Sequence, residues 1–161
     1  MTGFRASNSL LRHSFLVASA IALAVVLLAL VEYDTGSQPR EAPGLAAARA
    51  AHGLQLLRRD PTLDRVAVAQ AAYMALAQNM SHDTARGRDF TTRMRRSGFG
   101  RAASENIAHG TLTDGQIITA WLNSPNHRRN MMNPHYSHFG FASAPDPLNP
   151  NSHDWSMVIG Q

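Results

Sequence analysis

The chain of 161 residues contains no cysteine and no lysine, so that all 15 of its basic residues are arginines. Without cysteine there is no disulfide scaffold, no thiolate metal site, no iron–sulfur cluster and no cysteine nucleophile. Glutamate is also scarce and occurs only at Glu32, Glu41 and Glu105. The length suits one domain, and without disulfides such a domain has to be held together by its hydrophobic core alone.

An apolar run near the N-terminus is the longest hydrophobic segment of the chain. No residue between Ser14 and Val31 is charged, whereas Arg5 and Arg12 precede the run and Glu32 follows it. A helix needs roughly 17–25 such residues to span a bilayer, and the positive-inside rule places its N-terminus in the cytoplasm. The predicted order is a cytoplasmic N-terminus over 1–13, a transmembrane signal anchor over 14–33, a linker over 34–41 and an exported domain over 42–161.

The alternative for this run is a cleaved signal peptide, after which the domain would be secreted. The apolar region of a signal peptide is usually shorter, about 7–15 residues, and ends in a small-x-small cleavage site. The stretch Leu-Ala-Leu-Val at 28–31 lacks such a site. The sequence therefore favours an uncleaved anchor, and both alternatives place the domain outside the cytoplasm.

The positive charge of the chain, +4 in total, is concentrated in one segment. Residues 86–101 contain six arginines and one acidic residue, Asp89, so that this segment carries +5 (six minus one). Such a cluster binds nucleic acid in a cytoplasmic protein, but export excludes nucleic acid as a partner. Anionic lipid headgroups or wall polymers are the alternative partners, and a solvated helix face is the simplest interpretation.

Capping residues and hydrophobic spacing predict four helices followed by two strands. Asp60 caps the clearest helix, and Pro61 lacks the N–H that would be unpaired in the first turn. Thr113 and Gln116 fit a capping box, and Asn79 is expected to take the exit conformation after the second helix. The predicted helices cover 44–52, 61–78, 90–97 and 114–123, and the strands cover 136–142 and 154–159. Helices first and antiparallel strands last predict an α+β fold.

No short motif with a self-sufficient mechanism is present: the chain has no P-loop, nucleophile elbow, His-Glu-x-x-His or dinucleotide fingerprint. Eight histidines are spread along the chain without the spacing of a local metal cage. Glu105 is the only glutamate after the first helix of the domain, and it lies in a stretch of small and apolar residues over 102–108. A buried carboxylate there needs arginine or histidine partners, whereas an exposed loop glutamate is the alternative.

A succession of short motifs runs through residues 42–161. The motifs are His52-Gly53-Leu54, Asp60-Pro61-x-Leu63, Ser81-His82, Arg93-Met94-x-x-x-Gly98-Phe99, Glu105-Asn106-Ile107-Ala108, Trp121-x-x-Ser124-Pro125-Asn126-His127-Arg128-x-Asn130 and Trp155-x-x-Val158-Ile159-Gly160. In this order they resemble the motifs of bacterial CAP-domain proteins, also called SCP-like. These proteins belong to the superfamily of cysteine-rich secretory proteins, antigen 5 and pathogenesis-related 1 proteins.

The resemblance implies an α–β–α sandwich with a small, mostly antiparallel sheet and a shallow central cleft in which two histidines and acidic residues converge. By motif, His82 and His127 are the paired histidines and Glu105 is the first acidic residue. Some members of the family bind a divalent metal, so the resemblance implies His82 and His127 as ligands of zinc or another divalent ion. Eukaryotic relatives place a second glutamate where this chain has Ser124, which removes one metal ligand and one candidate general base.

Two functions are predicted from these features. In the first, a membrane-anchored, exported CAP-domain protein binds a lipid, a glycan or an envelope partner in the pocket of His82, Glu105 and His127. In the alternative, the same pocket belongs to a metal-dependent, peptidase-like hydrolase, in which Glu105 is base or ligand and the metal activates water. A third interpretation gives the polar triad only a role in fixing the fold. No catalytic residue is identified, and binding is favoured over catalysis because the second glutamate is replaced.

Overall fold

The computed structural model describes residues 43–161. The predicted cytoplasmic N-terminus, signal anchor and linker therefore lie outside the described residues. Among the helices of 43–161, none combines the length and the apolar composition needed to cross a bilayer.

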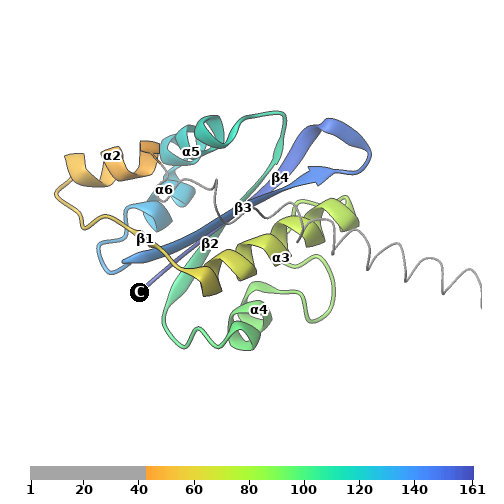
Figure 1. The fold of residues 1–161 in the computed structure, drawn as a ribbon, viewed down its shortest axis with the longest axis horizontal. Helices are drawn as coiled ribbons and strands as arrows, with labels where there is room; N and C mark the ends of the chain where they lie inside the picture. Colours follow the sequence, from red (N-terminus) through yellow and green to blue (C-terminus); the bar gives the residue numbers. More distant parts are fainter. Residues whose placement is uncertain (1–42) are drawn as a thin grey trace, which may run out of the picture. The chain divides into compact units, whose positions relative to one another are not determined.

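One four-stranded sheet separates two layers of helices (Figure 1). The strand order is β1-β3-β4-β2, in which β4 runs antiparallel to both neighbours and β1 runs parallel to β3. The strands are β1 (Arg58–Arg59), β2 (Ala103–Gly110), β3 (His138–Asp146) and β4 (Asn149–Gly160). On one face lie α2 (Pro43–Ala51), α5 (Asp114–Asn123) and α6 (Pro125–Met131), and on the other lie α3 (Pro61–Ala77) and α4 (Phe90–Ser97). The predicted α–β–α sandwich with a mostly antiparallel sheet is confirmed.

The helices begin where the capping residues predict. The Asp60 carboxylate accepts hydrogen bonds from the backbone N–H groups of Thr62 and Leu63, and the capping box of Thr113 and Gln116 is complete. The end of α3 differs by one residue from the prediction, because Gln78 rather than Asn79 takes the left-handed conformation, with φ 50°. Its side chain donates to the Ala75 carbonyl and to Asp146, and these hydrogen bonds offset the cost of that conformation.

Three elements were not predicted: the two-residue strand β1, the strand β2 and the helix α6. The stretch over 102–108 contains a strand, β2, although its small residues show no clear alternation. Pro125 does end α5, as predicted, but it also occupies the first turn of a further helix, α6, where its missing N–H costs nothing. The two predicted strands are both longer than expected, because β3 and β4 continue through the Pro/Asn-rich segment and form a hairpin.

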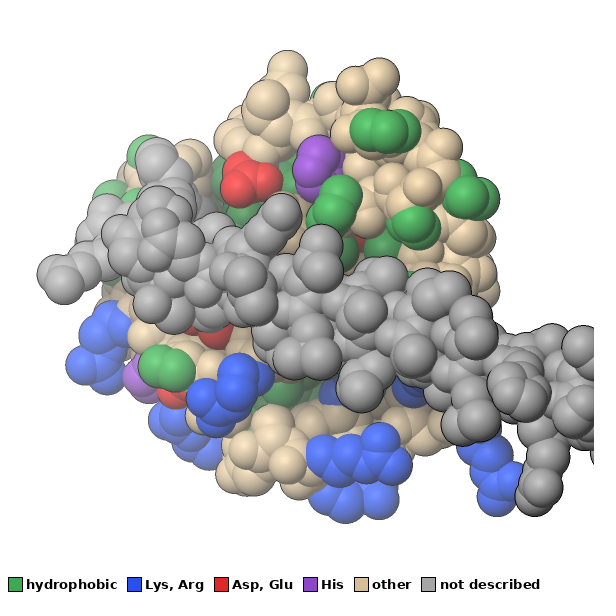
Figure 2. All heavy atoms as spheres, turned by 45° about the vertical axis from the view of Figure 1, so that its right-hand side comes forward, with side chains coloured by type: hydrophobic (Ala, Val, Ile, Leu, Met, Phe, Trp, Pro, Cys, Tyr) green, Lys and Arg blue, Asp and Glu red, His purple; other side chains and the backbone are tan. Residues whose placement is uncertain are grey.

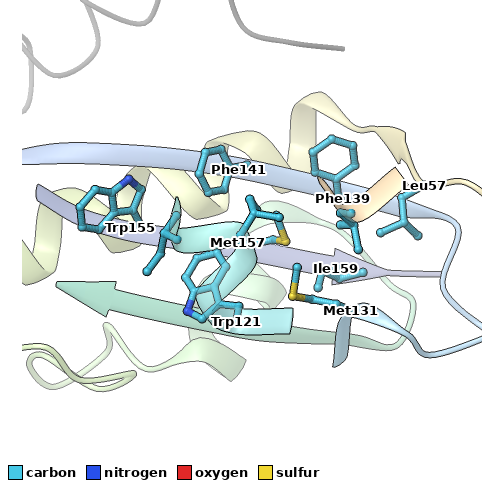
Figure 3. Packing of buried hydrophobic residues seen from close by; sticks show 11 residues of the cluster. Leu57, Trp121, Met131, Phe139, Phe141, Trp155, Met157 and Ile159 are labelled. Carbon is cyan, nitrogen blue, oxygen red and sulfur yellow. The ribbon is translucent and has the colours of Figure 1, made fainter. Parts of the chain in front are cut away.

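Alternate residues of β4 enter two hydrophobic clusters, as the pleat of a strand requires. Trp155, Met157 and Ile159 point toward the layer of α5 and α6, where they pack with side chains such as Trp121 (Figure 3). Val158 points to the other face and packs against residues of α3. Both clusters consist of residues between 45 and 159, so the described part of the chain contains its own core.

Candidate functional site

Glu105 lies on β2, which is an edge strand of the sheet, and only 1% of its side chain is exposed. Its Oε1 atom lies 2.7 Å from Nδ1 of His82, which belongs to the loop between α3 and α4. Its Oε2 atom pairs with the guanidinium of Arg93 on α4. The carboxylate therefore joins the edge of the sheet to a loop and a helix of one layer, and each of its oxygens is engaged.

Arg93 is part of this site although the sequence analysis did not single it out. Only 4% of its side chain is exposed, and besides Glu105 it donates to the backbone carbonyls of His82 and Arg88. It therefore holds both the carboxylate and the loop that carries His82. The available signal was its position next to Met94 and three residues after Phe90, on the apolar side of the predicted helix.

The contact with Glu105 determines which nitrogen of His82 is free. A carboxylate only accepts hydrogen bonds, so Nδ1 of His82 donates to it and the lone pair of the neutral ring is left on Nε2. Among the described residues, Nε2 has no hydrogen-bond partner, and 54% of the side chain is exposed. Glu105 thus orients His82 so that Nε2 is available to a ligand.

His127 reaches the edge strand from the opposite layer. It lies in the first turn of α6, and its Nδ1 atom is 3.0 Å from the hydroxyl of Ser124. The Ser124 side chain makes no capping hydrogen bond to α6, although it occupies the N-cap position. The backbone carbonyl of His127 accepts a bond of 3.2 Å from Asn106 on β2, and Asn130 holds the amide of Asn106 in turn.

The two histidines are coupled through their charges. Burial lowers the pKa of His127 below its ordinary value, and a positive charge on His82 lowers this pKa further. The structure thus brings His82 and Glu105 into direct contact and places His127 within electrostatic reach of His82. Within 43–161, no three side chains of the types His, Cys, Asp and Glu are grouped closely enough to hold a metal ion. The predicted metal ligands therefore offer two imidazoles without a third protein ligand from this part of the chain.

A second group of titratable side chains lies further along β2. His109 is 3.3 Å from Asp154 on β4 and 3.9 Å from Asp146 at the end of β3. Burial raises the pKa of Asp154, whereas the hydrogen bonds from the Leu148 N–H and the Gln78 side chain lower the pKa of Asp146. This group joins the end of β2 and the end of β3 to the middle of β4, and it is separate from the pocket residues.

The lowered pKa of His127 predicts a pH dependence of stability. The unfolded chain binds a proton at His127 near the ordinary histidine pKa of about 6.5, whereas the folded chain resists it. His127 therefore makes its whole contribution to the free energy of unfolding above the pKa of the unfolded chain. This contribution is lost as the pH falls from there through the lowered pKa of the folded chain. We expect His127→Gln to reduce the loss of stability between pH 7 and pH 5 in urea titrations. His135→Gln, at an exposed position, is the control. If the free energy of unfolding of His127→Gln fell with pH as steeply as that of the wild-type protein, the prediction would be contradicted.

The fold and the site together define the class of protein. An α–β–α sandwich that attaches a histidine–glutamate pair and a second histidine to neighbouring residues of its edge strand, Glu105 and Asn106, agrees with what the resemblance to CAP domains implies. The sequence matches the model of the cysteine-rich secretory protein family over residues 45–158. The chain therefore belongs to this family.

One protein of related sequence and two solved structures are similar to this chain. YkwD of Bacillus subtilis is 34% identical over 95 residues, which are 58% of this chain and 37% of YkwD, so the chain spans well under half of that relative. An outer surface protein of Borrelia burgdorferi superposes with a TM-score of 0.66 at 22% identity, covering 74% of this chain and 88% of that one. An extracellular protein with an SCP domain from Bacillus anthracis gives 0.65 at 24% identity, covering 73% and 37%. At these identities the two structures show the fold.

Proposed function

We propose that the protein is an exported, membrane-anchored CAP-domain protein that acts by binding, with His82, Glu105 and His127 as its pocket. One observation carries the proposal: both histidines have Nδ1 tied to a protein group, and neither Nε2 has a partner among the described residues. Two oriented imidazoles near one strand edge, each with an Nε2 atom that lacks a hydrogen-bond partner among the described residues, are suited to a polar ligand from the cell envelope. The ligand is a lipid, a glycan or an envelope protein.

The export of the domain is supported by its relatives and by its N-terminal sequence. The proteins of similar fold include an extracellular protein and an outer surface protein. The apolar run over 14–31 is suited to form the proposed anchor over 14–33, with the arginines on its N-terminal side. Secretion after cleavage of this run is the alternative, and it leaves the proposed binding role of the pocket unchanged.

A divalent metal is part of the proposal. The Nε2 atoms of His82 and His127 would hold the ion, and water or the ligand itself would complete its coordination, because 43–161 offers no third ligand close by. Imidazole binds a metal only when it is neutral, and the lowered pKa of His127 favours the neutral ring at pH 7. When bound, the ion would supply a positive centre for an anionic or polar group of the ligand.

The contacts of Glu105 favour binding over hydrolysis. A carboxylate that activates water as a general base needs an oxygen within hydrogen-bond reach of that water. In the structure, His82 and Arg93 engage one oxygen each, and the side chain is almost fully buried. The position at which the family resemblance implies a second carboxylate holds Ser124, whose hydroxyl contacts His127. Of the two carboxylates that the resemblance implies for a hydrolase, the first is thus buried in an ion pair and the second is replaced, which favours binding.

The metal part of the proposal predicts the outcome of calorimetry with zinc. The full-length protein and His135→Ala are expected to bind with the same affinity, because His135 is exposed and lies outside the pocket. His82→Ala and His127→Ala each remove one of two imidazoles, and each is expected to weaken binding by about 100-fold or more, beyond the 10–100-fold of a lost supporting contact. Equal heats in all four proteins would exclude these histidines as ligands.

The binding role itself is tested by native mass spectrometry of the full-length protein extracted with its co-purifying ligand. An added mass in the wild-type protein that is absent from the double variant His82→Ala/His127→Ala identifies a ligand of the pocket. A binding role would be contradicted if the wild-type protein carried no added mass in mild detergent, so that its spectrum and that of the double variant differed only by the substitutions. This readout does not depend on a chosen substrate or metal.

A further inference from the structure

Five arginines lie on α4 or in the segments directly before and after it. They are Arg86, Arg88, Arg95, Arg96 and Arg101, and we call them the arginine surface. All are exposed except Arg88, which is half-buried. Figure 2 shows basic side chains over the lower part of the domain, on the side of α3 and α4, and none over the upper part of the same view. The described part of the chain thus shows its basic side chains, in this view, on the side of the layer to which α4 belongs.

The charges of the arginine surface are not neutralised within the described part of the chain. The arginine–carboxylate ion pairs found in 43–161 join Arg59 to Asp64 and Arg93 to Glu105. Asp89, the acidic residue of the same segment, accepts from the backbone N–H of Thr92 and caps α4. No carboxylate of 43–161 lies within ion-pair distance of the five arginines, so their donors are open to an external anion.

Several of these side chains are held in place. The guanidinium of Arg88 lies 4.4 Å from the ring centre of Tyr73, and that of Arg101 lies 4.6 Å from the ring centre of Phe99. Arg96 donates to the carbonyl of Gly87 at 2.9 Å. Stacking uses the flat face of a guanidinium and leaves the N–H groups at its edge free. Because these side chains are already ordered, less conformational entropy is lost when they bind.

We propose that the arginine surface docks the domain on the anionic phospholipid headgroups of the membrane to which it is tethered. The guanidinium fork matches two oxygens of a phosphate group, a geometry that a lysine ammonium does not offer. The five arginines are distributed over a loop, a helix and the segment before β2, so they face a surface rather than one small anion. A bilayer with anionic lipids is such a surface.

The short linker strengthens this assignment, which rests on the proposed anchoring. Eight residues over 34–41 span at most about 28 Å when fully extended, so the domain stays close to the headgroups. The attraction of an anionic surface for arginine acts within a Debye length of about 8 Å at physiological salt. The tether keeps the domain within a few Debye lengths of the headgroups, and contact of the arginine surface with them would then be favoured over contact of its other surfaces.

Hydrogen exchange of the full-length protein in nanodiscs tests the docking. Discs of phosphatidylcholine are compared with discs that contain phosphatidylglycerol, at low salt and at 0.5 M NaCl. We expect slower exchange of residues 86–101 on phosphatidylglycerol at low salt only. Arg86→Gln/Arg95→Gln should weaken docking by about 25-fold, which is fivefold per arginine. Both side chains are exposed, so the fold is kept.

The matched control is Arg58→Gln/Arg129→Gln, which removes two exposed arginines from β1 and α6. This pair should keep the lipid-dependent protection. Equal exchange on both lipids in the wild-type protein would overturn the proposal, as would equal losses in the two double variants. Protection by soluble polyphosphate without protection by phosphatidylglycerol would assign the surface to a phosphate polymer instead. Failure of the anchoring is seen separately, because the protein would then leave phosphatidylcholine discs during gel filtration.

Discussion

Replacing Glu105 by alanine is expected to lower the free energy of unfolding by about 3–5 kcal/mol, the usual effect of removing one partner of a buried ion pair. The substitution leaves the Arg93 guanidinium buried without its carboxylate and His82 without the group that orients it. Urea unfolding monitored by the fluorescence of the two tryptophans measures the change. The zinc affinity of the pocket should fall in the same variant, because Nδ1 of His82 is no longer held.

Two controls separate this effect from a general sensitivity of the region. Asp83→Ala removes a carboxylate from an exposed residue next to His82 and should change stability by less than about 0.5 kcal/mol. Arg93→Met/Glu105→Leu removes both charges and should recover most of the stability, because no unpaired charge remains buried. If Glu105→Ala cost less than about 1 kcal/mol, the pair would not act as a buried ion pair.

Gly140→Ala is expected to destabilise the domain by about 3 kcal/mol or more, at the upper end of the cost of overpacking a core. A Cβ atom on residue 140 of β3 would overlap the backbone of Leu63 and Asp64 in the first turn of α3. This backbone cannot withdraw easily, because the Asp64 carboxylate accepts from the Phe141 N–H and is paired with Arg59. In thermal unfolding, we expect this variant to show no cooperative transition above 37 °C.

Gly100→Ala is the matched control for this substitution. A Cβ at residue 100 meets no atom within 4 Å, and its φ does not require glycine. We expect this variant to unfold within a few degrees of the wild-type protein, or slightly above it, because alanine reduces the entropy of the unfolded chain. Similar melting temperatures for the two variants would show that α3 and β3 do not approach as closely as the structure indicates.

The starts of the long helices were predictable because a cap is a local interaction. The Asp60 carboxylate binds N–H groups two and three residues further along the chain, and the capping box of Thr113 spans three residues. Such contacts depend on a single turn and therefore leave a pattern in the sequence. The prediction for the end of α3 was wrong by one residue, because Gln78 is stabilised by a hydrogen bond to Asp146, which is distant in the sequence.

Other features have no local pattern. The strand β2 has too few large residues to show alternation, and it forms because β4 offers a complete ladder from Ala103 to Gly110. Arg49, in an alanine-rich helix, is fully buried and donates to carbonyls of the α6–β3 segment, among them Met131 and Tyr136. Burial also lowers the pKa of Arg49. Nothing within one turn of Arg49 distinguishes it from a solvated arginine.

The sequence by itself determined the family, the starts of α3, α4 and α5 and the three side chains proposed for the pocket, because ordered motifs and caps are read along the chain. Only the tertiary structure decided what these side chains do. His82 and Arg93 lie 23 and 12 residues before Glu105, and the fold alone brings them to its two oxygens. The same folding separates the arginines of one charged segment, since it buries Arg93 against Glu105 and leaves five others on the surface. Burial and pairing depend on segments that meet only in the folded domain, and for this reason the charge of a residue is visible in the sequence whereas its partner is not.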